Sequence, residues 1–180
     1  MDILAYGEPM LEFNQTGAGD GRLYLQGFGG DSSNFAIAAA RQGARVAYVS
    51  ALGDDPYGRM LRALWDREGV DHSGVATDAA AYTAIYFVTH DERGHQFHFF
   101  RSGSAASRLT PAMLPRAMIE RAKVLHLSGI SLAISAQACD TAYAAIEMAR
   151  AAGAKVSFDT NLRLKLWPLA RARAVIRPIE

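Results

Sequence analysis

The sequence predicts an α/β protein with a doubly wound, mostly parallel sheet and helices on both faces. Short apolar runs typical of strands alternate with helical hydrophobic patterns, and several of these helical patterns stop at a glycine. The chain has 180 residues, of which 50% are hydrophobic and 21% charged. It is therefore long and apolar enough to bury one sizeable core.

The first half of the chain gives the beginning of this pattern. A strand is expected at residues 3–7, and a helix at 33–42, with Asp31 or Ser32 as its cap and Gly43 at its end. The elements expected next are a strand at 46–52 and a helix that places Met60, Leu61, Leu64 and Trp65 on one face and stops at Gly69.

The second half continues the alternation and then stops. The expected elements are strands at 124–127 and 156–159, a helix at about 135–153 between them, and a last helix at 169–176. An open sheet would normally continue with further strand–helix units, whereas the sequence ends at Glu180. We therefore expect residues 1–180 to form a single incomplete domain that lacks the C-terminal part of its fold.

Two pairs of strand-like segments do not fit the alternating pattern. Residues 11–15 pair in pattern with 22–26, and 83–89 with 96–100, each around a glycine-containing turn. They predict a small β lid, at about 11–26 and 83–100, inserted in the α/β body.

Composition and charge narrow the class of partner. The formal net charge is +1, with basic and acidic residues spread along the chain, so neither nucleic acid nor an anionic membrane is an expected partner. The sequence shows neither a basic, apolar leader nor an apolar run of membrane-spanning length. Cys139 is the only cysteine, which favours a reducing compartment. We expect a cytoplasmic protein that binds a small polar metabolite.

The most informative segment is Gly29-Gly30-Asp31-Ser32-Ser33-Asn34, which leads directly into the first predicted helix. Paired glycines let backbone amides approach a ligand, and Asp31 and Asn34 offer a carboxylate and a carboxamide to hydroxyl groups. The segment therefore suits polyol recognition. A capped helix after a tight turn explains the same residues without any ligand.

These residues carry a resemblance to a known family. The segment 29–53 resembles the first signature of the pfkB (ribokinase-like) carbohydrate kinases, with paired glycines, Asn34, Ala36, Gly43 and Gly53 in register. Within that family the chain is most similar to 2-keto-3-deoxygluconate kinases, on the evidence of Gly29-Gly30-Asp31, Ala84-Ile85-Tyr86, Phe97-His98-Phe99-Phe100-Arg101, Leu125-His126-Leu127-Ser128-Gly129 and Phe158-Asp159-Thr160-Asn161-Leu162-Arg163.

The resemblance implies a function and a set of site residues. It implies ATP-dependent phosphorylation of 2-keto-3-deoxygluconate in Entner-Doudoroff-type catabolism, with ATP and Mg²⁺ as cofactors. A homo-oligomer formed through the lid is one possible assembly. Gly30, Asp31 and Asn34 would contact sugar hydroxyls, and Tyr86, Phe99 and Arg101 would face the substrate. Asn161 and Arg163 would lie at the floor, near the transferred phosphate and the sugar acid. The base aspartate and most of the ATP site would lie outside this chain.

The choice of substrate depends on two arginines. A sugar acid carries a carboxylate, which a planar guanidinium pairs with at two points, so Arg101 and Arg163 are the expected acid-binding pair. The alternative for each is a surface arginine that forms a solvated ion pair and binds no ligand. A fructokinase-type or ribokinase-type kinase of a neutral sugar, and a non-catalytic sugar-binding fragment, remain alternatives. We expect no sugar-dependent ATP turnover from these 180 residues alone, because positioning and phosphate stabilisation need the missing elements.

Three further features are interpreted as structural. Gly17-Ala18-Gly19-Asp20 spells the family's catalytic motif, but it precedes a strand-like segment rather than opening a helix, so a hairpin turn is expected. His90, His95 and His98 cluster in the second predicted hairpin without a cysteine, and we expect an exposed hairpin and no metal site. Cys139 is expected to pack in a helix.

Overall fold

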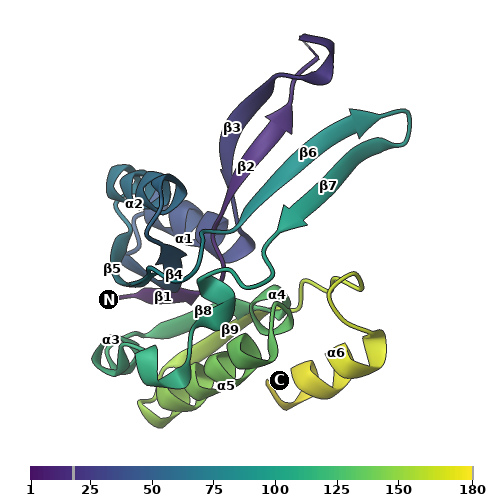
Figure 1. The fold of residues 1–180 in the computed structure, drawn as a ribbon. Helices are drawn as coiled ribbons and strands as arrows, with labels where there is room; N and C mark the ends of the chain where they lie inside the picture. Colours follow the sequence, from purple (N-terminus) through teal and green to yellow (C-terminus); the bar gives the residue numbers. More distant parts are fainter. Residues whose placement is uncertain (18, 180) are drawn as a thin grey trace.

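A five-stranded parallel sheet forms the body of the protein in this computed structural model, which describes residues 1–17 and 19–179. Ala18 and Glu180 lie outside the described residues. The strand order is β5-β4-β1-β8-β9, so the chain starts in the middle and winds outwards in both directions (Figure 1). The strands are β1 (Ile3–Tyr6), β4 (Val46–Gly53), β5 (Asp71–Asp78), β8 (Val124–Ser128) and β9 (Lys155–Asp159).

A second sheet of four strands projects from one end of this body (Figure 1). Its order is β3-β2-β6-β7; both outer pairs are antiparallel hairpins, and β2 runs parallel to β6 in the centre. The two predicted hairpins therefore join into one β lid. Its strands are β2 (Met10–Gln15), β3 (Tyr24–Gly29), β6 (Ile85–Asp91) and β7 (Gly94–Phe100).

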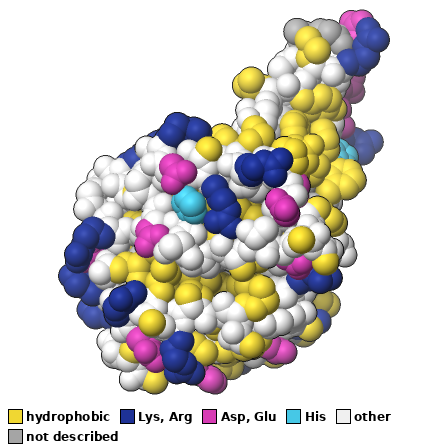
Figure 2. Space-filling view, turned by 60° about the vertical axis from the view of Figure 1, so that its left-hand side comes forward, with side chains coloured by type: hydrophobic (Ala, Val, Ile, Leu, Met, Phe, Trp, Pro, Cys, Tyr) yellow, Lys and Arg dark blue, Asp and Glu magenta, His cyan; other side chains and the backbone are white. Residues whose placement is uncertain are grey.

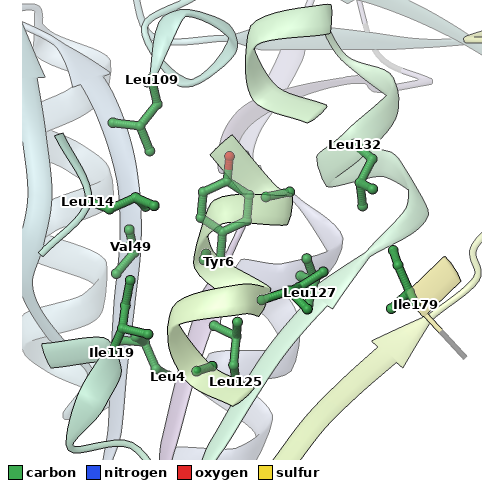
Figure 3. Close-up of a cluster of buried hydrophobic side chains, with 14 of the residues drawn as sticks. Leu4, Tyr6, Val49, Leu109, Leu114, Ile119, Leu125, Leu127, Leu132 and Ile179 are labelled. Carbon is green, nitrogen blue, oxygen red and sulfur yellow. The ribbon is translucent and has the colours of Figure 1, made fainter. Parts of the chain in front are cut away.

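Helices cover both faces of the body sheet, as doubly wound topology requires. On one face, α1 (Asp31–Arg41) and α2 (Pro56–Glu68) pack over Tyr48 and Leu52 of β4. The other face carries a larger core, shown in Figure 3, in which Leu4, Tyr6 and Leu125 lie beneath further helices. These helices are α3 (Arg116–Glu120), α4 (Gly129–Ala133), α5 (Ala136–Ala151) and α6 (Leu169–Ile176).

Strand alternation explains how one sheet supplies two cores. In β1, Leu4 and Tyr6 belong to the larger cluster, whereas Ala5 faces the cluster on the opposite side. Because both faces are covered, the strands read as continuous apolar runs, and β4 is buried along its whole length. Strands β1, β4, β8 and β9, the helix with Trp65 on its buried face and the last helix all follow the pattern that the sequence predicts, whereas β5 was not predicted.

The predicted start and cap of the first helix are wrong. Helix α1 begins at Asp31 rather than residue 33, and Gly30 precedes it with a φ of 102° and no side-chain cap. The carboxylate of Asp31 accepts hydrogen bonds from Ser128 and Asn161, which come from the far half of the chain. Asp31, which the sequence pattern suggested as a local helix cap, therefore forms long-range hydrogen bonds in the structure.

Two of the three features interpreted as structural lie in exposed hairpin turns. Asp20 has an exposed side chain in the connection between β2 and β3, so the described part of segment 17–20 is a turn, as predicted, and opens no α-helix. At the other hairpin, His90 and His95 are exposed and their Nδ1 atoms lie 2.9 Å apart, within hydrogen-bonding distance. Cys139 lies in α5, packed against the larger core.

The surface carries no concentrated charge on the face that Figure 2 shows, where basic and acidic side chains are mixed over the body. Over residues 1–17 and 19–179, no helix combines the length and hydropathy needed to cross a bilayer. In the same residues, no three histidine, cysteine, aspartate or glutamate side chains gather in a way that suits a metal ion.

Candidate functional site: a cavity beneath the β lid

A cavity of about 560 Å³ lies where the lid meets the body. It adjoins the start of α1 and the loop that follows β9, so it sits at the carboxyl end of the parallel strands, where doubly wound proteins bind ligands. All eight residues predicted from the sequence line this one cavity: Gly30, Asp31, Asn34, Tyr86, Phe99, Arg101, Asn161 and Arg163. The structure therefore brings together residues that lie up to 133 positions apart in the chain.

Asp31 is the polar centre of the cavity. The Ser128 hydroxyl donates to its Oδ2, and the Asn161 side-chain amide donates to the same atom over 3.0 Å. The backbone amide of Ser32 donates to Oδ1 over 2.8 Å. These bonds tie the start of α1 to the end of β8 and to the loop after β9. The carboxylate is thereby fixed in place while it still borders the cavity.

Gly30 makes this arrangement possible, because its φ of 102° is unfavourable for any residue with a side chain. A Cβ atom here would lie 2.5 Å from the carbonyl oxygen of Glu8 and 2.9 Å from Cα of Pro9. The segment after β1 and the start of α1 therefore touch backbone to backbone. Glycine is required both for the conformation and for the contact.

The lid covers the cavity with aromatic side chains. Tyr86 and Phe99 are cross-strand partners on β6 and β7, with ring centroids 5.4 Å apart. The Tyr86 hydroxyl donates to the Glu12 carboxylate, and burial is the first cause that raises the pKa of Tyr86. Gly29 leaves room for this ring, since a Cβ at that position would lie 2.5 Å from it. Tyr86 is thus held in one orientation above the cavity.

Arg101 borders the cavity, but it is not a free cation. Its guanidinium donates to the carboxylate of Glu8, and it lies over the Phe99 ring at 5.5 Å. Only 11% of the Arg101 side chain is exposed, and none of the Glu8 side chain. Ser104 donates a second hydrogen bond to Glu8 over 2.7 Å. Burial raises the pKa of Glu8, and the positive charge of Arg101 opposes that rise.

The loop after β9 supplies the remaining predicted residues. Asn161 has a positive φ of 32°, and its backbone amide donates to Asp159 over 3.0 Å, which forms a tight turn. Arg163 is exposed and borders the cavity, and its hydrogen bond in the structure is to the neighbouring carbonyl of Leu162. The guanidinium of Arg163 therefore retains donors that suit an anionic group.

The sequence patterns missed several residues of the site. Glu8, Ser104 and Ser128 hold Arg101 and Asp31 in place. Glu8 could have been found from its position directly after the first strand, because ligand sites gather at the carboxyl ends of strands. Ser128 directly follows the strand predicted at 124–127 and carried the same signal, whereas Ser104 follows no comparable strand end. Other lining residues missed are Met10, Phe97, Ile130, Leu162, Leu164, Lys165 and Leu166.

His126 lies beside this network and leads to a pH prediction. It is buried in β8, its ring stacks on Phe35 at 3.5 Å, and burial lowers its pKa from the usual 6.5. The unfolded chain therefore binds this proton more readily than the folded chain, so stability is lost as pH falls below about 6.5. We expect the urea midpoint to fall more between pH 7 and 5.5 in the wild type than in His126→Asn. An equal fall of the urea midpoint in the two proteins would contradict a lowered pKa of His126.

A doubly wound sheet with a cavity at the carboxyl ends of its strands, covered by an aromatic β lid, is the architecture in which α/β proteins bind small molecules. The family model described as pfkB family carbohydrate kinase matches residues 2–179. The chain therefore belongs to the pfkB family of carbohydrate kinases, as the resemblance in its sequence indicated.

Relatives and solved structures agree with this assignment. The chain is 43% identical over 172 residues to fructokinase-1 of Oryza sativa subsp. japonica, covering 92% of this chain and 53% of the rice protein. Fructokinase-2 of Solanum habrochaites is 42% identical over 174 residues, covering 93% of this chain and 52% of the relative. The chain thus spans about half the length of the curated relatives that it matches.

The fold itself matches solved members of the family. The PfkB protein from Polaromonas sp. JS666 superimposes with a TM-score of 0.92 at 34% identity, covering 99% of this chain and 62% of that protein. A fructokinase from Xylella fastidiosa, solved with bound ATP, superimposes with a TM-score of 0.88 at 30% identity, covering 97% of this chain and 55% of that one. The predicted ribokinase-like fold class is confirmed. The expected 2-keto-3-deoxygluconate specificity is not supported, since these curated relatives are named fructokinases.

Proposed function

We propose that this chain carries the sugar-binding half of an ATP-dependent kinase that phosphorylates a neutral sugar of the fructose type. The observation that carries this proposal is the fixed carboxylate of Asp31, which borders a lid-covered cavity together with Gly30 and Asn34. A carboxylate accepts hydrogen bonds from hydroxyl groups, which a neutral ketose presents in numbers. The names of the fructokinase relatives support the same choice of substrate.

The cavity suits the positioning that phosphoryl transfer needs. Such transfer depends on holding the acceptor hydroxyl in place and on excluding water, rather than on covalent chemistry by the protein. Asp31 would orient the sugar from the body, and the rings of Tyr86 and Phe99 would cover its apolar face from the lid. A lid of this kind removes water from the reacting hydroxyl.

ATP and Mg²⁺ are the cofactors that family membership implies. ATP supplies the phosphoryl group, and Mg²⁺ offsets the charge of the phosphates. Of the described residues, Asn161 and Arg163 fit the phosphate side of the cavity, because they share one loop and Arg163 presents guanidinium donors. The base aspartate and the remaining ATP contacts would come from the half of the relatives that this chain does not span.

A kinase of a sugar acid such as 2-keto-3-deoxygluconate is the second candidate. Arg163 and Lys165 favour it, because both are exposed cationic side chains that border the cavity and a carboxylate could pair with either. Arg101 favours it less than the sequence indicated, since Glu8 already occupies its guanidinium.

Calorimetric titration of the purified chain separates these candidates. D-fructose, D-ribose, D-gluconate and 2-keto-3-deoxygluconate would each be titrated at the same ionic strength. We expect saturable binding of D-fructose that is at least about tenfold tighter than binding of either acid. A tenfold difference in affinity is about the size of one charge-assisted hydrogen bond that the acid fails to make. Tighter binding of the acids would favour the second candidate, and a folded chain that binds none of the four would refute both.

A further inference from the structure

A buried ion pair lies behind the cavity wall, between Glu8 and Arg101, and the proposed function does not yet use it. Glu8 follows β1 and has no exposed side-chain surface, while Arg101 follows β7 and borders the cavity. Ser104 donates to the second carboxylate oxygen of Glu8. Both carboxylate oxygens are therefore engaged, and one of their partners is Arg101, which is less exposed than Arg163 and Lys165, the other cations that line the cavity. We call the part of the cavity lined by Arg101 and Asp31 the inner cavity.

The geometry points to Glu8 as the residue that sets the charge selectivity of this cavity. Resting on the proposed function, we infer that Glu8 matches the charge of Arg101, so that the inner cavity accepts a neutral polyol and disfavours a sugar carboxylate. Glu8 is a positioning residue in this scheme, because it acts through Arg101 and does not itself border the cavity.

Charge around the inner cavity supports this inference. Asp31 and Glu8 are acidic and Arg101 is basic, so the inner group carries one excess negative charge when all three are ionised. The other cations that border the cavity, Arg163 and Lys165, are exposed, where water screens them. A carboxylate placed beside Asp31 would meet its negative charge, while Arg101, the least exposed cation of the lining, is already paired with Glu8.

The orientation of Arg101 supports it as well. One face of its guanidinium lies over the Phe99 ring, and its amino group donates to Glu8. Its Nε is buried and has no hydrogen-bond partner within the described residues. The Arg101 side chain still lines the cavity, where a sugar hydroxyl, which both accepts and donates, is a sufficient partner for an accessible guanidinium N–H. Arg101 would therefore bind a sugar oxygen as a hydrogen-bond donor rather than as a free charge.

The test measures relative affinity for D-gluconate and D-fructose in the full chain. Glu8→Gln keeps the size of the side chain and removes its charge, which leaves the charge of Arg101 unmatched beside the cavity. We expect the affinity ratio to shift toward D-gluconate by about tenfold or more, because a charge-assisted pair becomes available to the acid. A ratio unchanged from the wild type would overturn the inference.

A double variant, Glu8→Gln with Arg101→Met, removes both charges and serves if the single variant does not fold. A neutral pair of similar volume avoids an unpaired buried charge. If Glu8 already matches the charge of Arg101, the ratio of D-gluconate to D-fructose affinity in the double variant stays within about threefold of the wild-type ratio. A threefold change is smaller than the effect of one net hydrogen bond. A selective loss of D-gluconate binding of about tenfold would instead show that Arg101 binds acids despite Glu8, which overturns the inference.

A third measurement separates this inference from the proposed function. If the wild type binds neither sugar, the proposed function fails, and inorganic sulfate then probes Arg101 alone. Sulfate should raise the thermal midpoint of Glu8→Gln by more than it raises the midpoints of the wild type and of the double variant. The reason is that sulfate binds the unmatched guanidinium in the folded state of Glu8→Gln. Equal shifts in all three proteins would overturn the role of Glu8.

Discussion

Asp31→Ala is expected to reduce the affinity for D-fructose by about 100-fold, which corresponds to losing one hydrogen bond from a sugar hydroxyl to a charged acceptor. The carboxylate borders the cavity and is fixed by Ser128 and Asn161, so its removal takes away the acceptor and releases both donors. Calorimetry measures the affinity, and a urea transition measured alongside shows that the variant is folded.

Asp54→Ala is the matched control for this variant. Asp54 is also an aspartate close to the start of a helix, but its side chain is 68% exposed. Its Oδ1 atom forms an ion pair with Nη1 of Arg59 at 3.6 Å. Exposed ion pairs of this kind contribute little to stability. We expect D-fructose affinity in Asp54→Ala to equal that of the wild type. A loss of less than about threefold in Asp31→Ala, smaller than one net hydrogen bond, would show that Asp31 does not bind the sugar.

Gly30→Ala is expected to lower the free energy of unfolding by about 3 kcal/mol, the sum of backbone strain and overpacking. Alanine is unfavourable at a φ of 102°, and its methyl group would lie 2.5 Å from the Glu8 carbonyl oxygen. Both clashing atoms of the neighbouring segment belong to the backbone, so no flexible side chain can move aside. The shift of the urea midpoint measures the effect.

Gly43→Ala separates the two causes. Gly43 also has a positive φ, of 87°, but a Cβ there would meet nothing within 4 Å. We expect a loss of about 1 kcal/mol from the backbone conformation alone. If Gly30→Ala costs no more than Gly43→Ala, the close approach between the end of β1 and the start of α1 is absent in solution.

Local features of the fold could be predicted from the sequence. The buried face of α2 around Trp65, its end at Gly69 and the pairing of the lid strands depend on hydrophobic period and on glycine, which act over a few residues. Strand β5 was missed because its sequence, DHSGVATD, is polar and lies at the edge of the sheet, where burial alternates weakly. Helices α3 and α4 are too short for a periodic signal.

The candidate site was predicted as a set of residues but not as a set of interactions. Resemblance selected Asp31 and Arg101, yet their partners come from distant parts of the chain: Asn161 is 130 positions from Asp31, and Arg101 is 93 positions from Glu8. No local pattern reports such contacts. For this reason Arg101 was predicted to bind a sugar acid, whereas the structure shows its guanidinium paired with Glu8.

Mapping D-fructose onto the folded chain tests the central claim most directly. In a titration followed by the ¹H–¹⁵N NMR signals of backbone amides, we expect the signals that move to cluster at residues 30–34, 86–101 and 161–163, around the cavity beneath the lid. Saturable shifts confined to these segments would agree with a neutral-sugar site centred on Asp31. Shifts centred instead on the shallow hollow beside Arg62 and His72, or no shifts in a folded chain at saturating sugar, would contradict it.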